Sequence, residues 1–145
     1  MKNERLIDII SGIPSLMHAL FHDIEIAKLD LSVNRTQRKV LIVIDRLPGV
    51  TMTQISRMSG LEKGSFTAVA DKLIAMGLVK RERDPEDRRK IMLRLTREGN
   101  AITRILIQNA EAHLEQKLSR LHDAERRELM DAFVVLSRYA EKLKK

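Results

Sequence analysis

The chain opens with an apolar stripe of helical spacing that extends from residue 1 to residue 31. Gly12 and Pro14 interrupt this stripe, and a proline removes a backbone donor from a helix interior. Either the helix kinks at this point, or the residues before Ser11 form a separate short helical arm. The stripe consists of Leu6, Ile9, Ile10, Ile13, Met17, Leu20, Phe21, Ile24, Ala27 and Leu31.

Two short helices with strong start signals are predicted next. Asn34 with Gln37, and Thr51 with Gln54, stand three residues apart, which is the spacing of a capping box at a helix start. We expect the first helix to stop before the Pro-Gly pair at 48–49. The second should end at Gly60, because glycine readily takes the positive φ of a helix end.

A third helix, from 63 to 76, combines an apolar stripe with a polar face of small residues. Such a face suits a DNA major groove, where short hydroxyl and cationic side chains reach base edges and phosphates. We expect Lys63, Ser65 and Thr67 to face bases or nearby phosphates, and Gly64 to permit close approach. Lys72, and Arg57 on the preceding helix, should contact the DNA backbone. The polar face consists of Lys63, Gly64, Ser65, Thr67, Ala68, Asp71 and Lys72, and the apolar stripe of Phe66, Val69, Ala70, Leu73 and Met76.

A charged β-hairpin is predicted after this helix, with strands at 78–83 and 90–95. The second strand alternates Ile91, Leu93 and Leu95 on one face. The turn between the strands, DPEDRR, ends in two arginines, and an arginine on a thin ribbon can reach the narrow minor groove. Alone, this turn would be interpreted as a solvated loop with internal ion pairs. The helix before it favours a DNA-binding wing.

These segments resemble the MarR-type winged helix-turn-helix transcription regulators, and the resemblance spans nearly the whole chain. It is carried by DKLIAMGLV at the end of the third helix, RERDPEDRRK in the wing and LRLTREG after it. The resemblance implies that Arg89 enters the minor groove beside the basic Arg88, and that Asp87 braces the wing. Ala68 stands where many members carry an arginine, which affects base preference rather than DNA binding.

Two helices are predicted after the wing. Thr96 should cap a helix of about 25 residues, which would be about 38 Å long. A second helix should follow from Asp123 to Lys144. The apolar stripes of these two helices are longer than one small body covers. In the alternative arrangement the two helices pack only on each other within the chain, which leaves part of the apolar length uncovered. The stripes are Ile102, Ile105, Leu106, Ala110, Leu114, Leu118 and Leu121, and then Leu129, Phe133, Leu136, Ala140 and Leu143.

We therefore predict a mainly α fold with a small β-hairpin wing, in which the helices of two chains interleave as a homodimer. The resemblance also implies a dimer. The expected organisation is a single domain over 1–145, with dimerisation helices at 1–33 and 100–145 and a DNA-binding lobe at 34–99. Two-fold symmetry then predicts a pseudo-palindromic operator with half-sites about one turn of DNA apart.

Composition supports a polyanionic partner and excludes several chemistries. The chain holds 27 Lys+Arg against 20 Asp+Glu, a net charge of +7, of which residues 51–99 contribute +4. It has no cysteine, which excludes disulfides, thiolate zinc sites and thiol redox sensing. We find neither a membrane-spanning run nor a signal-peptide core, so we expect a cytoplasmic protein without a membrane partner.

Other functional classes are less well supported. No Ser-His-Asp or paired-carboxylate constellation is apparent, so we expect neither enzymatic activity nor a cofactor. Among the alternatives to DNA binding, a winged helix used only for protein contacts is better supported than an enzyme. The basic groove-facing helix and the wing arginines favour double-stranded DNA instead. By resemblance, such proteins are repressors that are released when a small ligand enters a cleft between the DNA-binding lobe and the dimer helices. The sequence does not identify that ligand.

His18 and His22 lie four residues apart on one helix face, with Asp23 adjacent. This pattern is half of a metal site. It is also an ordinary arrangement on a partly exposed helix, and the sequence places no third ligand.

Overall fold

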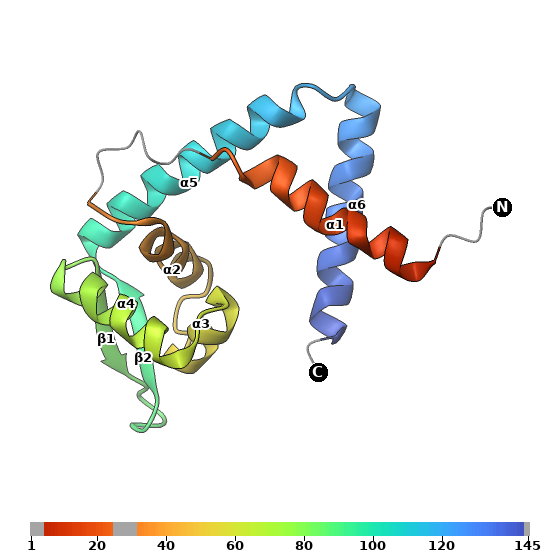
Figure 1. Ribbon diagram of the computed structural model, residues 1–145. Helices are drawn as coiled ribbons and strands as arrows, with labels where there is room; N and C mark the ends of the chain where they lie inside the picture. Colours follow the sequence, from red (N-terminus) through yellow and green to blue (C-terminus); the bar gives the residue numbers. More distant parts are fainter. Residues whose placement is uncertain (1–4, 25–31, 144–145) are drawn as a thin grey trace. The chain divides into compact units, whose positions relative to one another are not determined.

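The computed structural model describes residues 5–24 and 32–143, which form six helices and one hairpin (Figure 1). The elements follow the chain in the order α1 (Leu6–Phe21), α2 (Arg35–Arg46), α3 (Met52–Ser59), α4 (Lys63–Ala75), β1 (Val79–Arg83), β2 (Ile91–Leu95), α5 (Arg97–Leu118) and α6 (Asp123–Leu143). They fall into two compact units. One unit comprises 25–110, and the other combines 1–24 with 111–145.

Reciprocal side-chain bonds set the starts of α2 and α3, as the spacing predicts. The Asn34 side chain accepts from the Gln37 N–H at 2.9 Å, and the Gln37 side chain accepts from the Asn34 N–H at 2.8 Å. Thr51 and Gln54 repeat this capping box at 3.3 and 3.1 Å. Gly60 ends α3 with a φ of 67°, which only glycine adopts without strain.

The winged lobe is built around one apolar core. Helix α2 packs behind α3 and α4, and β1 and β2 form an antiparallel pair in which Val79 is opposite Leu95 and Arg83 is opposite Ile91. The first half of α5 belongs to the same unit. The core contains Val40, Leu41, Ile44, Ile55, Phe66, Ala70, Leu73, Val79, Leu93 and Leu106.

The predicted burial pattern of the second strand is partly wrong. Leu93 is fully buried, but Ile91 is 40% exposed, whereas Met92 on the opposite face is only 7% exposed. The reason is that Thr51 forms a bridge to Met92, so the start of α3 covers that face of β2. Ile91 lies at the wing end of the strand, opposite Arg83.

A compact joint connects α4, the hairpin and α5. Gly77, with a φ of 73°, ends α4 in a Schellman motif, in which the Leu78 N–H donates to the Leu73 carbonyl at 3.0 Å. The Thr96 N–H donates to the Leu78 carbonyl at 3.0 Å, and the Thr96 hydroxyl donates to the Gly77 carbonyl at 2.6 Å. That hydroxyl also accepts from the Gly99 N–H at 3.0 Å, as expected of a helix cap.

Helix α1 excludes one of the two arrangements expected for the N-terminal stripe, the separate short arm. It runs without a break through Gly12 and Pro14, so no separate arm precedes Ser11. A proline in a helix interior removes one backbone hydrogen bond, but the helix continues on both sides of Pro14. The helix ends at Phe21. Part of the predicted continuation, 25–31, lies outside the described residues.

Polar contacts join the helices of the unit that contains α1 and α6. Lys117 on α5 donates to the Ala19 carbonyl at 2.7 Å and pairs with Asp23. Arg126 on α6 forms a bidentate ion pair with Glu115, both bonds being 2.7 Å long. Helix α5 ends at Leu118, before the predicted Leu121, and α6 begins at Asp123 as expected.

Large apolar side chains of this unit remain exposed. No residue of α6 is buried, and Leu20 is the one buried residue of α1. None of the helices described is long and apolar enough to cross a membrane. The exposed apolar residues of α1 and α6 are Leu6, Ile7, Ile9, Ile10, Ile13, Met17, Phe21, Met130, Val134, Val135, Leu136, Tyr139 and Leu143.

The close packing of α5 on Leu78 predicts that a single methyl group added at Gly99 strongly destabilises the fold. A Cβ added to Gly99 would stand 1.9 Å from the Leu78 carbonyl oxygen, which is itself bonded to Thr96. We expect Gly99→Ala to lower the free energy of unfolding by about 3 kcal/mol, because a backbone atom must move to relieve the overlap.

Gly12→Ala is the matched control. A Cβ at this position of α1 meets nothing within 4 Å, so alanine should leave stability unchanged or raise it by up to about 1 kcal/mol. Urea unfolding of both variants checks the prediction. Equal midpoints would contradict the close packing of α5 on Leu78.

Candidate nucleic-acid interface

The outer face of α4 is presented to solvent over its whole length. The inner face packs through Phe66, Ala70 and Leu73 against α2, α3 and β1. Burial of that face orients the other one outward. All predicted contact residues of this helix are exposed: Lys63, Gly64, Ser65, Thr67, Ala68 and Lys72.

The start of α4 leaves backbone donors available. Glu62 precedes the helix, but its side chain accepts no capping hydrogen bond. The first turn of a helix attracts anions, because its N–H groups lack partners within the helix. The Thr67 hydroxyl donates to the Lys63 carbonyl at 2.9 Å and so retains only its acceptor capacity. A Cβ added at Gly64 would meet no protein atom within 4 Å.

An ion pair connects α4 to the hairpin. Asp71, the acidic residue of the outer face, pairs with Arg81 of β1, ten residues further along. The pair neutralises the carboxylate and ties the strand to the helix. We did not anticipate this contact from the sequence, because neither residue belongs to a local pattern that specifies the other.

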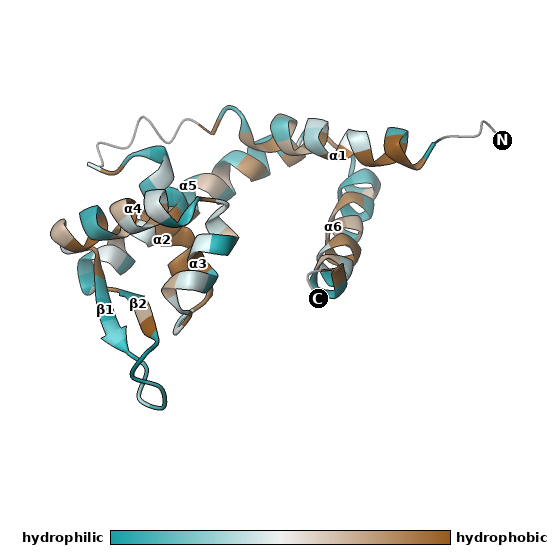
Figure 2. Ribbon diagram, turned by 60° about the horizontal axis from the view of Figure 1, so that its bottom comes forward, coloured by the Kyte–Doolittle hydropathy of each residue, from teal (hydrophilic) through white to brown (hydrophobic). Residues whose placement is uncertain are grey.

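The tip of the wing uses its own acids to shape the turn. Asp84 accepts from the N–H groups of Glu86 and Asp87 at 2.8 and 3.3 Å. The Asp87 carboxylate accepts from the Arg89 N–H at 3.1 Å. These are Asx-type bonds, in which a side chain holds the backbone of a turn. Figure 2 shows the whole tip as hydrophilic.

Arg88 and Arg89 project from this braced turn. Both are exposed, and neither has a carboxylate within ion-pair distance among the residues that the structure describes. Asp84 and Asp87 are therefore engaged with backbone, and the two guanidinium groups are left for another molecule.

Glu82 organises the charges at the base of the wing. Lys80 approaches its carboxylate at 2.9 Å, and Arg94 of β2 pairs with it from the neighbouring strand. The hydrogen bond from Lys80 does most to lower the pKa of Glu82 below its ordinary value. Arg94 also lowers this pKa, against partial desolvation, which raises it. The carboxylate thus stays charged and holds both strands together.

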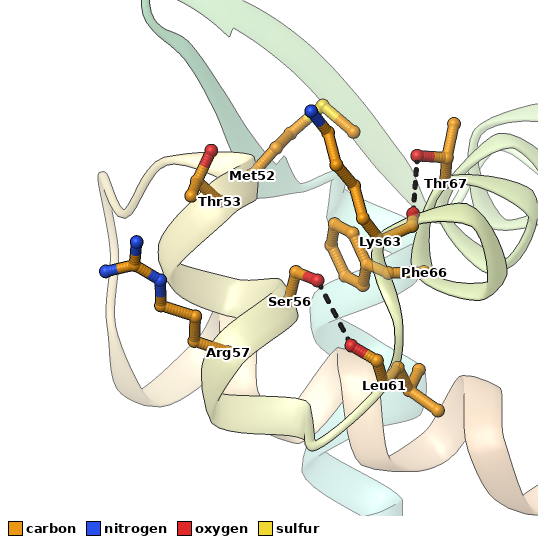
Figure 3. Close-up of a pocket in the computed structure, with 8 residues that line it drawn as sticks. All are labelled: Met52, Thr53, Ser56, Arg57, Leu61, Lys63, Phe66 and Thr67. Atoms are coloured by element: carbon orange, nitrogen blue, oxygen red, sulfur yellow. Dashed lines mark hydrogen bonds between the residues drawn. The ribbon is translucent and has the colours of Figure 1, made fainter.

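Arg57 and Lys63 flank a cavity between α3 and α4 (Figure 3). The cavity has a volume of about 450 Å³ and a largely apolar lining that includes Met52, Leu61 and Phe66. Arg57 lies on the exposed side of α3, and Lys63 is the first residue of α4. Sequence reasoning missed this cavity, because its two walls come from different helices.

The histidine pair of α1 is a stacked pair of rings. The ring centres of His18 and His22 are 4.3 Å apart, and Asp23 lies against His22. Desolvation, followed by the charges of His18 and Lys117, lowers the pKa of His22. Within the described residues, no three His, Cys, Asp or Glu side chains are arranged to hold a metal ion. The nearby Lys117 ammonium also disfavours a cation.

Three short helices followed by a two-stranded hairpin define a winged helix-turn-helix protein. The sequence pattern of the MarR family matches residues 31–90. The uncharacterized HTH-type transcriptional regulator YfiV of Bacillus subtilis is 31% identical over 118 residues, which cover 81% of this chain and 72% of YfiV. The MarR proteins of Salmonella and Escherichia coli align over 62% of their own length.

Solved structures share the fold. FabT of Streptococcus pneumoniae, in complex with DNA, has a TM-score of 0.72 and 22% identity, and the match covers 93% of this chain and 96% of FabT. PcaV of Streptomyces coelicolor, in complex with its natural ligand, has a TM-score of 0.60 and 22% identity, and the match covers 94% of each chain. This chain belongs to the MarR family. It is a transcriptional regulator and not an enzyme.

Proposed function

We propose that this chain acts as a homodimeric repressor in the cytoplasm, where it binds pseudo-palindromic operators in double-stranded DNA and is released by a small molecule. The observation that carries the proposal is the pairing of charges on the winged lobe. Asp71, Glu82, Asp84 and Asp87 are engaged inside the lobe, whereas the cations of α4 and the wing tip face solvent.

Helix α4 is the element that enters the major groove in this proposal. Lys63, Ser65 and Thr67 lie toward its start and face base edges or adjacent phosphates. Gly64 allows the DNA to approach the helix backbone. Ala68, in the middle of the exposed face, offers a methyl group rather than a hydrogen-bond donor, so it makes at most an apolar contact with a base.

The wing and the flanking cations complete the contact. Arg89 enters the minor groove, where the negative potential is strongest over A·T-rich sequence, with Arg88 beside it and Asp87 bracing the turn. Lys72 and Arg57 bind backbone phosphate, which contributes affinity without sequence preference. The FabT complex with DNA supports this assignment at the level of the fold.

The dimer is proposed from the exposed apolar side chains of α1 and α6. Two helices of 16 and 21 residues bury Leu20 alone between them, which is an unusual state for a free surface. A second copy of the chain covers such stripes through an isologous interface. The domain division follows: helices at 1–33 and 100–145 serve the dimer, and 34–99 binds DNA, although Thr103 and Leu106 also contribute to the lobe core.

A winged helix that contacts only proteins is the competing function. Such a module has no need of two arginines without carboxylate partners at the tip of a braced turn. The direct test is affinity for the promoter region beside its own gene against random duplex, over several salt concentrations. We expect tight binding to two protected half-sites, about one turn apart. Equal, steeply salt-sensitive affinity for both duplexes would contradict sequence-specific regulation.

Arg89→Ala and Lys72→Ala should weaken DNA binding in different ways. Loss of Arg89 should cost roughly 1 to 3 kcal/mol on the operator and relax any A·T preference beside the half-sites. Loss of Lys72 should weaken all sequences alike and lower the salt slope by about one. Fluorescence anisotropy on both duplexes separates the two effects. An unchanged footprint and affinity in Arg89→Ala would refute the minor-groove assignment.

Gly64→Ala tests whether DNA lies against α4. Nothing in the protein occupies the space beside Gly64, so alanine should not lower the free energy of unfolding. Its higher helix propensity should raise that free energy by up to about 1 kcal/mol. We expect operator affinity to fall nonetheless, since the added methyl group meets the DNA. Urea unfolding and operator titration of one preparation give both numbers. Full operator affinity would show that this turn stands away from the groove.

Leu136→Gln should weaken the dimer. Leu136 lies in the apolar stripe of α6 and is 46% exposed in the single chain. Arg138→Gln, on another side of the helix, is the control. Sedimentation equilibrium should show a higher dimer dissociation constant for Leu136→Gln only. Identical constants for the two variants would mean that this stripe does not form the interface.

A further inference from the structure

We propose that Thr67 reads the exocyclic amino group of an adenine or a cytosine in the operator, and that it binds neither a keto base nor a phosphate. This role rests on the proposed function, in which the outer face of α4 enters the major groove. It deepens that function by fixing the kind of base that one side chain accepts. The observation behind it is the direction of a single hydrogen bond in α4.

The Thr67 hydroxyl is turned back onto its own helix. It donates to the Lys63 carbonyl at 2.9 Å, and Figure 3 shows the hydroxyl directed at that carbonyl oxygen. A threonine in a helix has two favoured χ1 rotamers, and a bond of this kind selects one of them. The hydroxyl oxygen keeps its lone pairs but has no second hydrogen to give. The exposed Thr67 side chain is therefore presented to solvent as an acceptor only.

The major groove offers such an acceptor one kind of partner. Amino N–H groups project there from adenine N6 and cytosine N4, whereas guanine O6 and N7, adenine N7 and thymine O4 are acceptors. Phosphate oxygens are acceptors as well. To bind any of these acceptors, the Thr67 hydroxyl must give up its bond to Lys63, which lowers the affinity of that contact. An amino group is the partner that leaves the bond within the helix intact.

Ser65 is the contrasting hydroxyl of the same helix. It is exposed, and among the residues that the structure describes nothing is hydrogen-bonded to its side chain. A free hydroxyl can donate to a phosphate or a base and can also accept from an amino group. Ser65 therefore tolerates either kind of partner, whereas Thr67 requires a donor.

The neighbours of Thr67 on the outer face of α4 favour the same kind of base. Gly64 and Ala68 offer no side-chain donor to a base beside Thr67. Asp71 lies one turn further along and is itself an acceptor, with one carboxylate oxygen bonded to Arg81. A carboxylate in the major groove accepts from an amino group and disfavours a keto oxygen. Asp71 thus supports the preference that the Thr67 hydroxyl sets.

The test removes single hydrogen-bonding groups from the operator and compares the full parent chain with Thr67→Val. Valine is also β-branched and has a similar helix propensity, but it lacks the hydroxyl. At each position of a half-site, purine replaces adenine and 2-pyrimidinone replaces cytosine, so that only the amino group is lost. A second series of duplexes uses 7-deazapurines, which lack N7 instead. Any weakening of the base pair itself affects both proteins alike and cancels in the comparison.

We expect one position in each half-site at which loss of the amino group weakens binding of the parent chain about fivefold and leaves binding of Thr67→Val unchanged. Loss of N7 should act equally on both proteins at every position. Thr53→Val, at an exposed threonine of α3, is the matched control and should respond to each duplex as the parent chain does. If Thr67→Val removed the effect of losing N7, Thr67 would be a donor and the proposal would be overturned. Sequence-specific binding in which no amino group depends on Thr67 would overturn it as well.

A second measurement needs no DNA. In the full chain labelled with ¹³C at the threonine methyl groups, the couplings of the Thr67 methyl carbon to its backbone nitrogen and carbonyl carbon report χ1. We expect a single rotamer, the one that directs the hydroxyl at Lys63, and averaged couplings would overturn the fixed direction of the bond. If the chain bound every duplex with equal affinity, the proposed function would fail and this contact with it. Sequence-specific binding without a role for Thr67 would overturn the contact alone.

Discussion

The winged lobe depends on the backbone of Leu78, where three elements converge. The Leu78 N–H closes α4 by donating to Leu73, and its carbonyl accepts from Thr96 at the start of α5. Gly99 packs so closely on that carbonyl that no side chain fits between them. The hairpin begins at the next residue, Val79. One residue therefore fixes where α4 ends, where the wing begins and where α5 leaves the lobe.

The contacts that the charged side chains of the winged lobe make matter as much as the number of these side chains. The net charge of +7 is moderate for 145 residues, and it would not by itself define an interface. Four acids near the outer face have an internal role: Asp71 binds the hairpin, Glu82 joins the strands, and Asp84 and Asp87 hold the turn. These acids thus stabilise the shape of the lobe, and Arg88 and Arg89 remain exposed at the wing tip without a carboxylate partner among the described residues.

Local signals in the sequence predicted the elements well, and contacts between distant residues were predicted poorly. The capping boxes at Asn34 and Thr51 and the turn at Gly60 depend on residues within one helical turn of each other, so their spacing is sufficient. The burial of Met92 depends on Thr51, which is forty-one residues earlier. The Asp71–Arg81 pair and the α3–α4 cavity likewise require the folded chain. Exposure of the α4 face follows from its apolar stripe, but no spacing specifies its charge partners.

Gly64 and Gly99 are both helical glycines near a helix start, yet different steric constraints act on them. Position 99 is restricted by the fold, because the Leu78 carbonyl occupies the space of a side chain. Position 64 is free of any such restriction within the protein. On the proposed DNA contact, a side chain at position 64 alters only the fit to DNA, whereas one at position 99 displaces the Leu78 carbonyl. Variation at 64 among relatives would record changes of target, and constancy at 99 would record descent of the fold.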